Sequence, residues 1–415
     1  MIAISVPQQE ELSPFDEYVY IDYLAKVPTQ LAVPHGDPTG EYARSQLDCR
    51  GVVVLQPESP ACDTGRTQPA TAYPLTGKTS ADIYTPIYFA VTWAAAQPLV
   101  WTGVDLTDAG RIVGGLWLGL GVVLMFLLMT RLRVPPLLAW GLSVLVIASP
   151  AVHWANGYVS TDAPTLAVGA GLGLLAALVY TRKASMLWLV VASVVGVLIK
   201  FQNIIAVCLV VIVFVVLAVR DTLERRPGGW RQGLRMLVTD RLVIGAAVAL
   251  GSVLVAQVVW MLARTAMTVG TTPRQGVDTP VSLTNLLRES YNFLTKTAIA
   301  WDGAPPAPVE MFIGTVLVVL GIAGVVGMIF VGKPRSTRSL VALSVLVAAT
   351  LSAPVLGLVL AVVVGEYVPL PPRYGMSLLP FFILCAGWLL AQRTWTSGVV
   401  AVGASALLVA SMLHA

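Results

Sequence analysis

The chain has 415 residues, of which 56% are hydrophobic and only 12% are charged, with a mean hydropathy of +0.79 and a formal net charge of +4. Soluble domains carry about a quarter charged residues, so this composition excludes a soluble globular protein. A helix needs about 20 apolar residues to cross the bilayer core, and the sequence reaches that length repeatedly. We therefore predict an all-α polytopic bundle of transmembrane helices, and we expect no nucleic-acid partner.

Residues 1–110 form a polar outer region that contains the pair Asp16-Glu17 in the run SPFDEYVYIDYL. A carboxylate beside aromatic residues can be partly desolvated, which suits a general base that takes a proton from an acceptor hydroxyl. The alternative is an acidic pair that starts a helix, as the helix macrodipole favours. The later run DIYTPIYFAVTWAAAQPLVW is interrupted by prolines, and we expect it to lie in the membrane interface.

Four cysteines and three histidines give little indication of metal binding. Cys49 and Cys62 lie in the outer region, where either a disulfide or two free thiols is compatible with the compartment. Cys208 and Cys385 fall within apolar runs and are expected to be small core residues. The three histidines form no metal-binding cluster in the sequence.

The start of the chain raises a question of topology. A polar region of about a hundred residues reaches the outer face only when a hydrophobic segment leads it, and MIAISVP at residues 1–7 resembles the end of such a segment. We expect one leading transmembrane helix to be missing, and a genuine N-terminus without a first span is the alternative.

The apolar runs predict ten transmembrane helices, which makes residues 111–415 the membrane domain, with a second outer loop at 265–308. Lys200 separates two of the runs, so either one helix kinks there or two short helices meet at the membrane surface. We favour the second because a lysine is costly at the middle of the membrane. This is the one interrupted helix in the prediction. The ten runs are 111–131, 135–152, 162–181, 186–200, 203–219, 241–264, 309–331, 340–364, 374–391 and 396–413.

The basic residues predict the orientation. Fourteen basic and only three acidic residues fall in the loops on one side of the predicted bundle. Cytoplasmic loops carry an excess of lysine and arginine, so this side is cytoplasmic. Asp16-Glu17 then lies on the outer, extracytoplasmic face of a multi-pass cell-membrane protein.

Three further residues combine charge with positions at the outer ends of predicted spans. Asp162, in YVSTDAPTLAVG, either caps the following helix together with its Ser-Thr neighbours or faces the same cavity as Asp16. There it would hold an acceptor hydroxyl, or a metal ion together with Asp16. Lys200 and Arg373 either extend to the lipid headgroups or hold a phosphate, whose developing negative charge they would stabilise.

These segments together resemble the GT-C superfamily of polytopic glycosyltransferases, in particular the branch of protein O-mannosyltransferases and lipid A aminoarabinose transferases. The resemblance covers about residues 10–210 and 365–390. The matching segments are FDEYVY at Asp16-Glu17, TPIYFA at Tyr88, STDAPTLA at Asp162, IKFQNIIA at Lys200 and PPRYGMSLLPF at Arg373-Tyr374. The family's Gly-Pro after the lysine is absent here, where Phe201-Gln202 follows.

The resemblance implies inverting transfer of a sugar from a polyprenyl-phosphate-linked donor to an acceptor on the outer face, as part of cell-envelope biogenesis. Asp16 would be the base and Glu17 its support. The donor phosphate would be held by Lys200, Arg373 and Tyr374. The acceptor or substrate would contact Asp162, Tyr88 and Tyr20.

Two rival functions remain open on sequence alone. A transporter or flippase of lipid-linked sugars would also need cations for a phosphate, although such proteins often show paired broken helices in two halves. A non-catalytic assembly protein with a large outer region is the other. The sequence also leaves open the sugar, whether the acceptor is a lipid, glycan or protein, and the need for a divalent cation.

Overall fold

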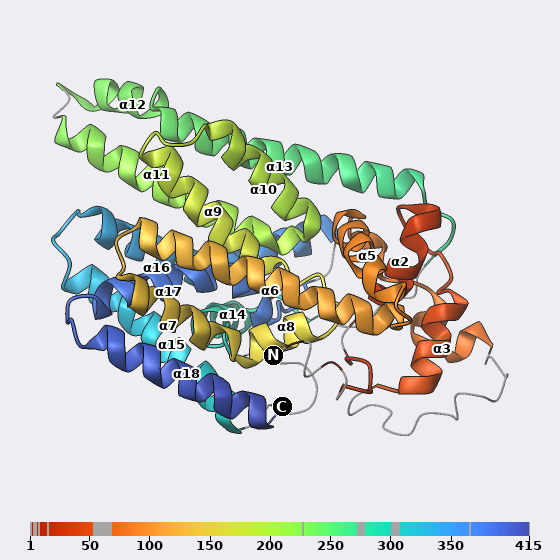
Figure 1. The fold of residues 1–415 in the computed structure, drawn as a ribbon. Helices are drawn as coiled ribbons and strands as arrows, with labels where there is room; N and C mark the ends of the chain where they lie inside the picture. Colours follow the sequence, from red (N-terminus) through yellow and green to blue (C-terminus); the bar gives the residue numbers. More distant parts are fainter. Residues whose placement is uncertain are drawn as a thin grey trace.

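The computed structural model describes residues 2, 6, 9–14, 16–52, 69–225, 228–271, 279–299, 308–364 and 367–414. Within these ranges the secondary structure is helical apart from two isolated β-bridges. Long helices run roughly parallel to one another, and a smaller helical region at one end of them contains the N-terminal part of the chain (Figure 1). The all-α prediction is confirmed.

Each of the ten predicted apolar runs overlaps a helix, but fewer of these helices are long enough to span a membrane. In the part of the chain that the structure describes, seven helices have the necessary length and composition, or eight if a bent pair is one span. The long helices are α6 (Leu106–Arg131), α11 (Ile204–Glu224), α13 (Arg241–Ala266), α15 (Pro308–Phe330), α16 (Thr337–Val364), α17 (Leu379–Leu390) with the preceding 3-10 turn η5 (Pro372–Leu378), and α18 (Thr396–His414).

The other apolar helices are shorter than a full span or bent. The two short ones of the membrane domain are α9 (Thr165–Tyr180) and α10 (Met186–Ile199). The bent pair is α7 (Pro136–Ile147) and α8 (Pro150–Gly157), which meet at 64°. The bend has a local cause, because the Ser149 side chain caps α8 and Pro150 occupies its first position. This second interruption was absent from the sequence prediction.

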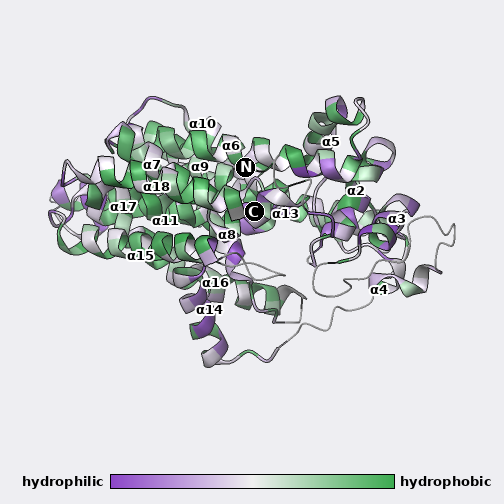
Figure 2. Ribbon diagram, turned by 60° about the horizontal axis from the view of Figure 1, so that its bottom comes forward, coloured by the Kyte–Doolittle hydropathy of each residue, from purple (hydrophilic) through white to green (hydrophobic). Residues whose placement is uncertain are grey.

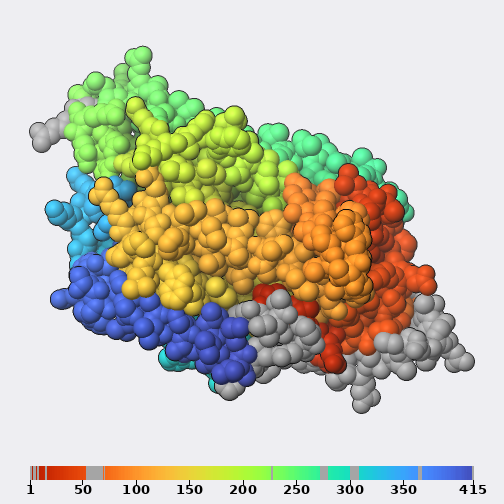
Figure 3. Space-filling model, viewed as in Figure 1, coloured from red at the N-terminus to blue at the C-terminus, as the bar shows by residue number. Residues whose placement is uncertain are grey.

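The N-terminal region is built from short helices. They are α2 (Glu17–Gln30), α3 (Glu41–Arg50), η2 (Ala70–Ala72), α4 (Pro74–Gly77), η3 (Ala81–Ile83) and α5 (Ile87–Val100). Hydrophilic residues gather around α2, α3 and α4, whereas hydrophobic residues dominate the long helices (Figure 2). The region packs directly against the bundle (Figure 3). The run expected in the membrane interface forms α5, which contacts α2 and α6.

An ion pair anchors this region to the bundle. Arg111 and Glu17 are both fully buried and form two hydrogen bonds of 2.9 Å. Arg111 lies in the second turn of α6, which begins five residues before the predicted start of the first span. A buried charge is tolerated only when it is paired and hydrogen-bonded, so each residue depends on the other.

The remaining elements complete the two ends of the bundle. The amphipathic helix α12 (Trp230–Val238) connects α11 and α13, and α14 (Leu283–Thr295) lies within the second predicted outer loop. Cys49 is disulfide-bonded, whereas Cys62 lies outside the described residues. Cys208 and Cys385 are free cysteines, and Cys385 is fully buried, as expected of a core residue.

Candidate functional site

Asp16 occupies the residue before α2, where its backbone is left-handed with φ of 62°. Aspartate tolerates this conformation better than most residues with a side chain. Its side chain is exposed and makes no capping hydrogen bond, but Oδ2 accepts one of 3.4 Å from the Tyr20 hydroxyl. The pair Asp16-Glu17 does start a helix, yet the Asp16 carboxylate is turned toward Tyr20 instead of the helix end.

The adjacent Glu17 has a different environment. Its Oε1 accepts hydrogen bonds from Arg111 Nε and Val159 N, and its Oε2 accepts from Arg111 Nη2 and Ser13 N, all between 2.8 and 2.9 Å. Four donors on a fully buried carboxylate leave no room for a substrate. This geometry makes Glu17 a structural residue that fixes the start of α2, and hence the position of Asp16, against the loop at Val159.

Asp162, Lys200 and Arg373 meet in one buried cluster. Lys200 Nζ donates to Asp162 Oδ1 at 2.5 Å, and Arg373 Nε lies 3.3 Å from Asp162 Oδ2. The three residues are 2 to 6% exposed. Lys200 and Arg373 therefore do not extend to the lipid headgroups, and that alternative is wrong for both.

Each residue of this cluster lies in a short segment at the end of a helix. Lys200 is the extended residue between α10 and the 3-10 turn η4 (Phe201–Asn203). Asp162 lies in the turn before α9, whose N-cap position is Pro164 and which has no side-chain cap. The capping alternative for Asp162 is thus not found, because its two oxygens face the two cations. Arg373 lies in η5, directly before α17.

Aromatic rings enclose the cations. Lys200 Nζ lies 4.6 Å from the centroid of the Tyr374 ring, and the Arg373 guanidinium lies 5.3 Å from the same centroid. Trp154 of α8 faces Arg373 at 5.6 Å. Such rings favour a cation while keeping water out. Trp154 was not predicted from the sequence, since only the bend between α7 and α8 brings it here.

Hydroxyl groups link the Asp16 side of the site to the Asp162 loop. The Tyr20 and Tyr84 hydroxyls lie 3.0 Å apart, and the Tyr20 oxygen accepts a hydrogen bond from Thr161 Oγ1 at 3.4 Å. Tyr88 contributes differently, because its hydroxyl accepts from the Ser160 backbone N–H at 3.1 Å and so holds the loop itself. Tyr84 was missed, although a second tyrosine four residues before Tyr88 in IYTPIY was the available signal.

Burial changes the ionisation of these tyrosines. It raises the pKa of Tyr20 and of Tyr84 well above the ordinary value. After burial, neighbouring groups act in the same direction on both residues, among them Asp16, Asp162 and Tyr374. The two phenols are therefore neutral hydrogen-bond donors at physiological pH.

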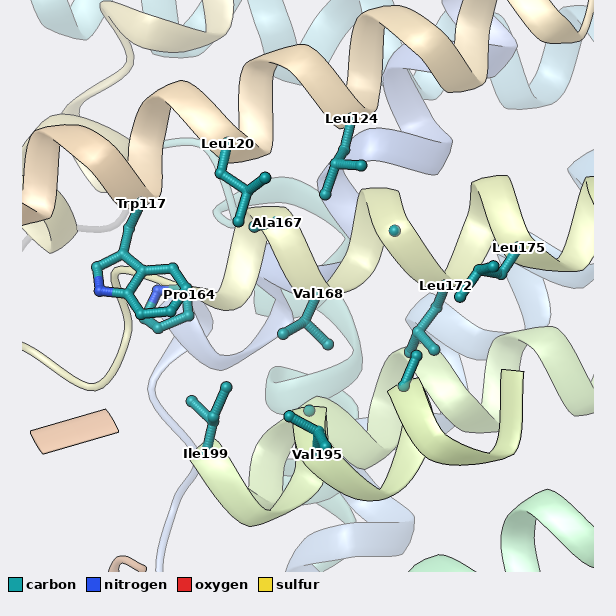
Figure 4. A pocket seen from close by; sticks show the side chains of 13 residues that line it. Trp117, Leu120, Leu124, Pro164, Ala167, Val168, Leu172, Leu175, Val195 and Ile199 are labelled. Carbon is teal, nitrogen blue, oxygen red and sulfur yellow. The ribbon is translucent and has the colours of Figure 1, made fainter. Parts of the chain in front are cut away.

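An apolar groove of about 210 Å³ begins beside this cluster. Its lining comes from α6, α9 and α10, and it starts at Trp117, Pro164 and Ile199, which neighbour the Asp162 loop and Lys200 (Figure 4). From there it follows α9 toward Leu172 and Leu175. Almost no polar atom faces it, so a hydrocarbon chain suits it better than water or a sugar.

The residues do not fit a metal ion shared by Asp16 and Asp162. In the described ranges there is no group of three histidine, cysteine or acidic residues placed to bind a metal. Asp162 directs both oxygens at cations, and a divalent ion there would have to displace them while lying next to two positive charges.

Comparisons with known proteins give a limited result. No family model and no curated protein matches the chain. A matching solved structure is the oligosaccharyltransferase of Archaeoglobus fulgidus, crystallised with a tethered acceptor peptide that contains the NVT sequon. The match has 12% sequence identity and a TM-score of 0.45, and it covers 99% of this chain and 54% of that one. This chain thus spans about half the length of that protein. Because the TM-score is below 0.5, the interpretation of the site depends on its own residues.

Proposed function

We propose that this multi-pass membrane protein is a GT-C-type glycosyltransferase that transfers a sugar from a polyprenyl-phosphate-linked donor to an envelope acceptor. One observation carries the proposal. An exposed carboxylate, Asp16, is joined by the Tyr20 hydroxyl to the loop that carries Asp162. Asp162 in turn contacts a buried lysine and arginine, and an apolar groove begins next to that lysine. A base, an anion site and a hydrocarbon site are the three parts that such a reaction needs.

The anion site holds the donor phosphate. Among the described residues, Lys200 donates to Asp162 alone, so an ammonium with three N–H groups keeps donors for phosphate oxygens. Arg373 adds a planar guanidinium, whose fork geometry matches a phosphate. Tyr374 positions both cations through its ring. Asp162 serves here to orient the cations, and any contact between Asp162 and the acceptor would come in addition.

The apolar groove holds the first isoprenoid units of the donor. A lipid whose phosphate is at Lys200 can continue past Ile199 into the groove without crossing a polar surface. A nucleotide would lose its hydrogen bonds to water in such a groove, whereas an isoprenoid chain leaves a lipid environment that is equally apolar. The groove therefore favours a lipid-linked donor over a soluble nucleotide sugar.

The transfer step follows from this arrangement. The acceptor hydroxyl attacks the anomeric carbon while Asp16 takes its proton, and a new C–O bond forms. The bond between the anomeric carbon and the phosphate oxygen breaks, its electron pair stays on the phosphate, and the cations stabilise the added charge. Attack opposite the leaving phosphate inverts the sugar. Tyr20 positions the Asp16 carboxylate, and Tyr88 supports the Asp162 loop.

The topology belongs to the same proposal. Residues 1–110 and the loop 265–308 would be extracytoplasmic, and the basic loops cytoplasmic, as the distribution of arginine and lysine favours. The short helices α9 and α10 would then complete the ten spans, with their ends meeting the site inside the bundle.

The test is an assay with the purified protein, a panel of polyprenyl-phosphoryl sugars and lipid, glycan and peptide acceptors. Removing a general base costs about 10²- to 10⁴-fold in rate, so Asp16→Asn should lower kcat/KM by that factor. Glu10→Gln is the matched control, because Glu10 is an exposed carboxylate of the same segment. Transfer at the wild-type rate by Asp16→Asn would refute the assignment of the base.

A lipid-linked-sugar transporter remains the second candidate because of one observation. The structure contains two interrupted segments, at Lys200 and between α7 and α8, whereas the sequence indicated one. Paired broken helices are typical of transporters. Movement of the donor across a vesicle membrane without any transfer would favour this candidate.

A further inference from the structure

A second apolar groove lies toward the other end of the bundle, away from Lys200. It has a volume of about 80 Å³ and is lined by α6, α9, α11, α16 and α17. Its wall is apolar except for two residues, Tyr180 and Thr337. The lining residues used below are Ala177, Tyr180, Thr337 and Trp388.

The polar end of this second groove is bordered by arginines. Arg220 donates to the Tyr180 hydroxyl and to Thr337 Oγ1, both at 2.9 Å. The guanidinium of Arg338 lies over the ring of Trp388, 5.6 Å from its centroid. Two side chains of the groove wall and its tryptophan are thus each in direct contact with an arginine.

These arginines differ in their partners. Arg220 also bonds Asp221 at 2.7 Å, so its charge is compensated. Arg338 is exposed and has no carboxylate partner in the parts of the chain that the structure describes. Arg131, next to the lining residue Leu132, donates to Thr181, while its Nε is buried without a hydrogen-bond partner in those same ranges. Positive charge therefore exceeds negative charge here, and some donor capacity is unused.

The shape and charge of the second groove fit an amphiphile with an anionic head. A guanidinium pairs with a phosphate through two parallel hydrogen bonds, and the apolar wall takes a hydrocarbon chain. The helix α9 has 16 residues and is about 24 Å long, and it separates this end from the Lys200 end. A donor whose phosphate is at Lys200 cannot reach Arg338 with the same phosphate.

We propose that the second groove binds an anionic phospholipid, with one acyl chain between α9, α11 and α17 and the phosphate at Arg338 and Arg131. The lipid is a structural ligand that joins five helices at the membrane boundary. The proposal does not depend on the transferase activity, because none of its residues lies in the Asp16–Lys200 site.

The experiment uses the purified full-length chain after delipidation in a mild detergent. Phosphatidylglycerol, phosphatidylcholine and polyprenyl phosphate are added separately, and binding is followed by native mass spectrometry and by thermal unfolding. We expect one tightly bound phosphatidylglycerol and a raised Tm. Phosphatidylcholine has the same phosphate but also a choline cation, which the arginines repel, so it should bind roughly ten- to a hundredfold more weakly.

Two variants separate the head site from the chain site. Arg338→Gln should weaken phosphatidylglycerol binding by roughly ten- to a hundredfold, whereas Lys333→Gln removes a charge from an exposed residue of the loop before α16 and should not. Ala177→Phe fills the groove and should abolish binding of any phospholipid.

Three results would overturn the proposal: equal binding of both phospholipids, unchanged binding by Arg338→Gln, or preferential binding of polyprenyl phosphate that Ala177→Phe removes. If Ala177→Phe does not fold, the lipid comparison and the pair Arg338→Gln and Lys333→Gln still decide the question.

Discussion

The two grooves share helices α6 and α9 but end in different electrostatic environments. The first begins at Ile199, next to Lys200, which is nearly inaccessible and shares Asp162 with Arg373. The second ends at Arg220 and Arg338, where Arg338 is exposed and Arg220 is bonded to hydroxyl groups and an aspartate. A charge pair 4 Å apart contributes about 1 kcal/mol in bulk water but about 4 kcal/mol where the protein lowers the effective dielectric constant to about 20. Burial therefore suits the first end to stabilising a charge that develops in a reaction, whereas the second end suits anchoring a headgroup.

The largest expected effect concerns the buried ion pair between Glu17 and Arg111, which holds the Asp16 segment against the bundle. Glu17→Ala leaves Arg111 buried without its carboxylate, and breaking such a buried pair costs about 3–5 kcal/mol. We expect a large loss of folded protein, measured by thermal unfolding and by yield after detergent extraction. Glu10→Gln should retain the wild-type Tm. A fully stable Glu17→Ala protein would contradict the structural role of this ion pair.

The next effect tests whether loss of a positive charge slows transfer only at the first groove. Lys200→Met keeps most of the side-chain volume but removes the charge, and losing one such stabilising group costs about 10²- to 10³-fold in kcat. The measurement is single-turnover transfer with saturating donor. Lys333→Gln, which removes a charge at the opposite end, should transfer at the wild-type rate. If both variants are equally active, Lys200 does not hold the leaving phosphate.

A smaller effect tests the contents of the first groove. Ala192→Phe narrows the groove between α9 and α10 and crowds the donor chain. Overpacking of this kind costs about 1–3 kcal/mol, so we expect KM to rise roughly tenfold. A donor analogue with one isoprene unit should be unaffected. Val123→Phe is the control, since Val123 is exposed on α6 and does not line the groove. An equal change for long and short donors would place the lipid chain elsewhere.

The smallest effect is a pH dependence of stability that comes from the buried tyrosines near Asp16. Burial raises the folded-state pKa of Tyr20 and Tyr84, so the unfolded chain loses these protons first as the pH rises. Their contribution to stability is complete below pH of about 10 and is lost as the pH rises from there through the folded-state pKa. Comparing the Tm of wild type and Tyr20→Phe between pH 8 and 11 measures this. The variant should lose less stability across the interval, and parallel curves would contradict the assignment.

Several parts of this protein follow from local sequence. Apolar runs located every long helix, because hydrophobicity over about 20 residues is a property of the segment itself. The identities of Asp16, Asp162, Lys200 and Arg373 as charged residues beside apolar runs were equally visible. Grouping them into one site came from a resemblance between short motifs. In the structure Lys200 and Arg373 contact Asp162, and Asp16 is linked to the Asp162 loop through the Tyr20 hydroxyl.

Other features depended on partners far away in the chain. Asp16 and Glu17 are adjacent and chemically similar, but Arg111, 94 residues beyond Glu17, decides which carboxylate is buried. Local capping rules pointed to Asp162 as a helix cap, and a lysine 38 residues later takes its side chain instead. The predicted run 162–181 also began three residues before α9, because hydropathy does not show where a helix must start to leave Asp162 at the site.

The sequence by itself determined that the chain is a bundle of membrane helices with an acidic, tyrosine-rich outer segment, since these are properties of composition and of short segments. Only the tertiary structure decided which charges are buried, which are paired, and where each apolar groove ends. The physical reason is that desolvation and ion pairing act between groups brought together by packing, and the cost of burying Lys200 is offset only where Asp162 arrives from another helix end.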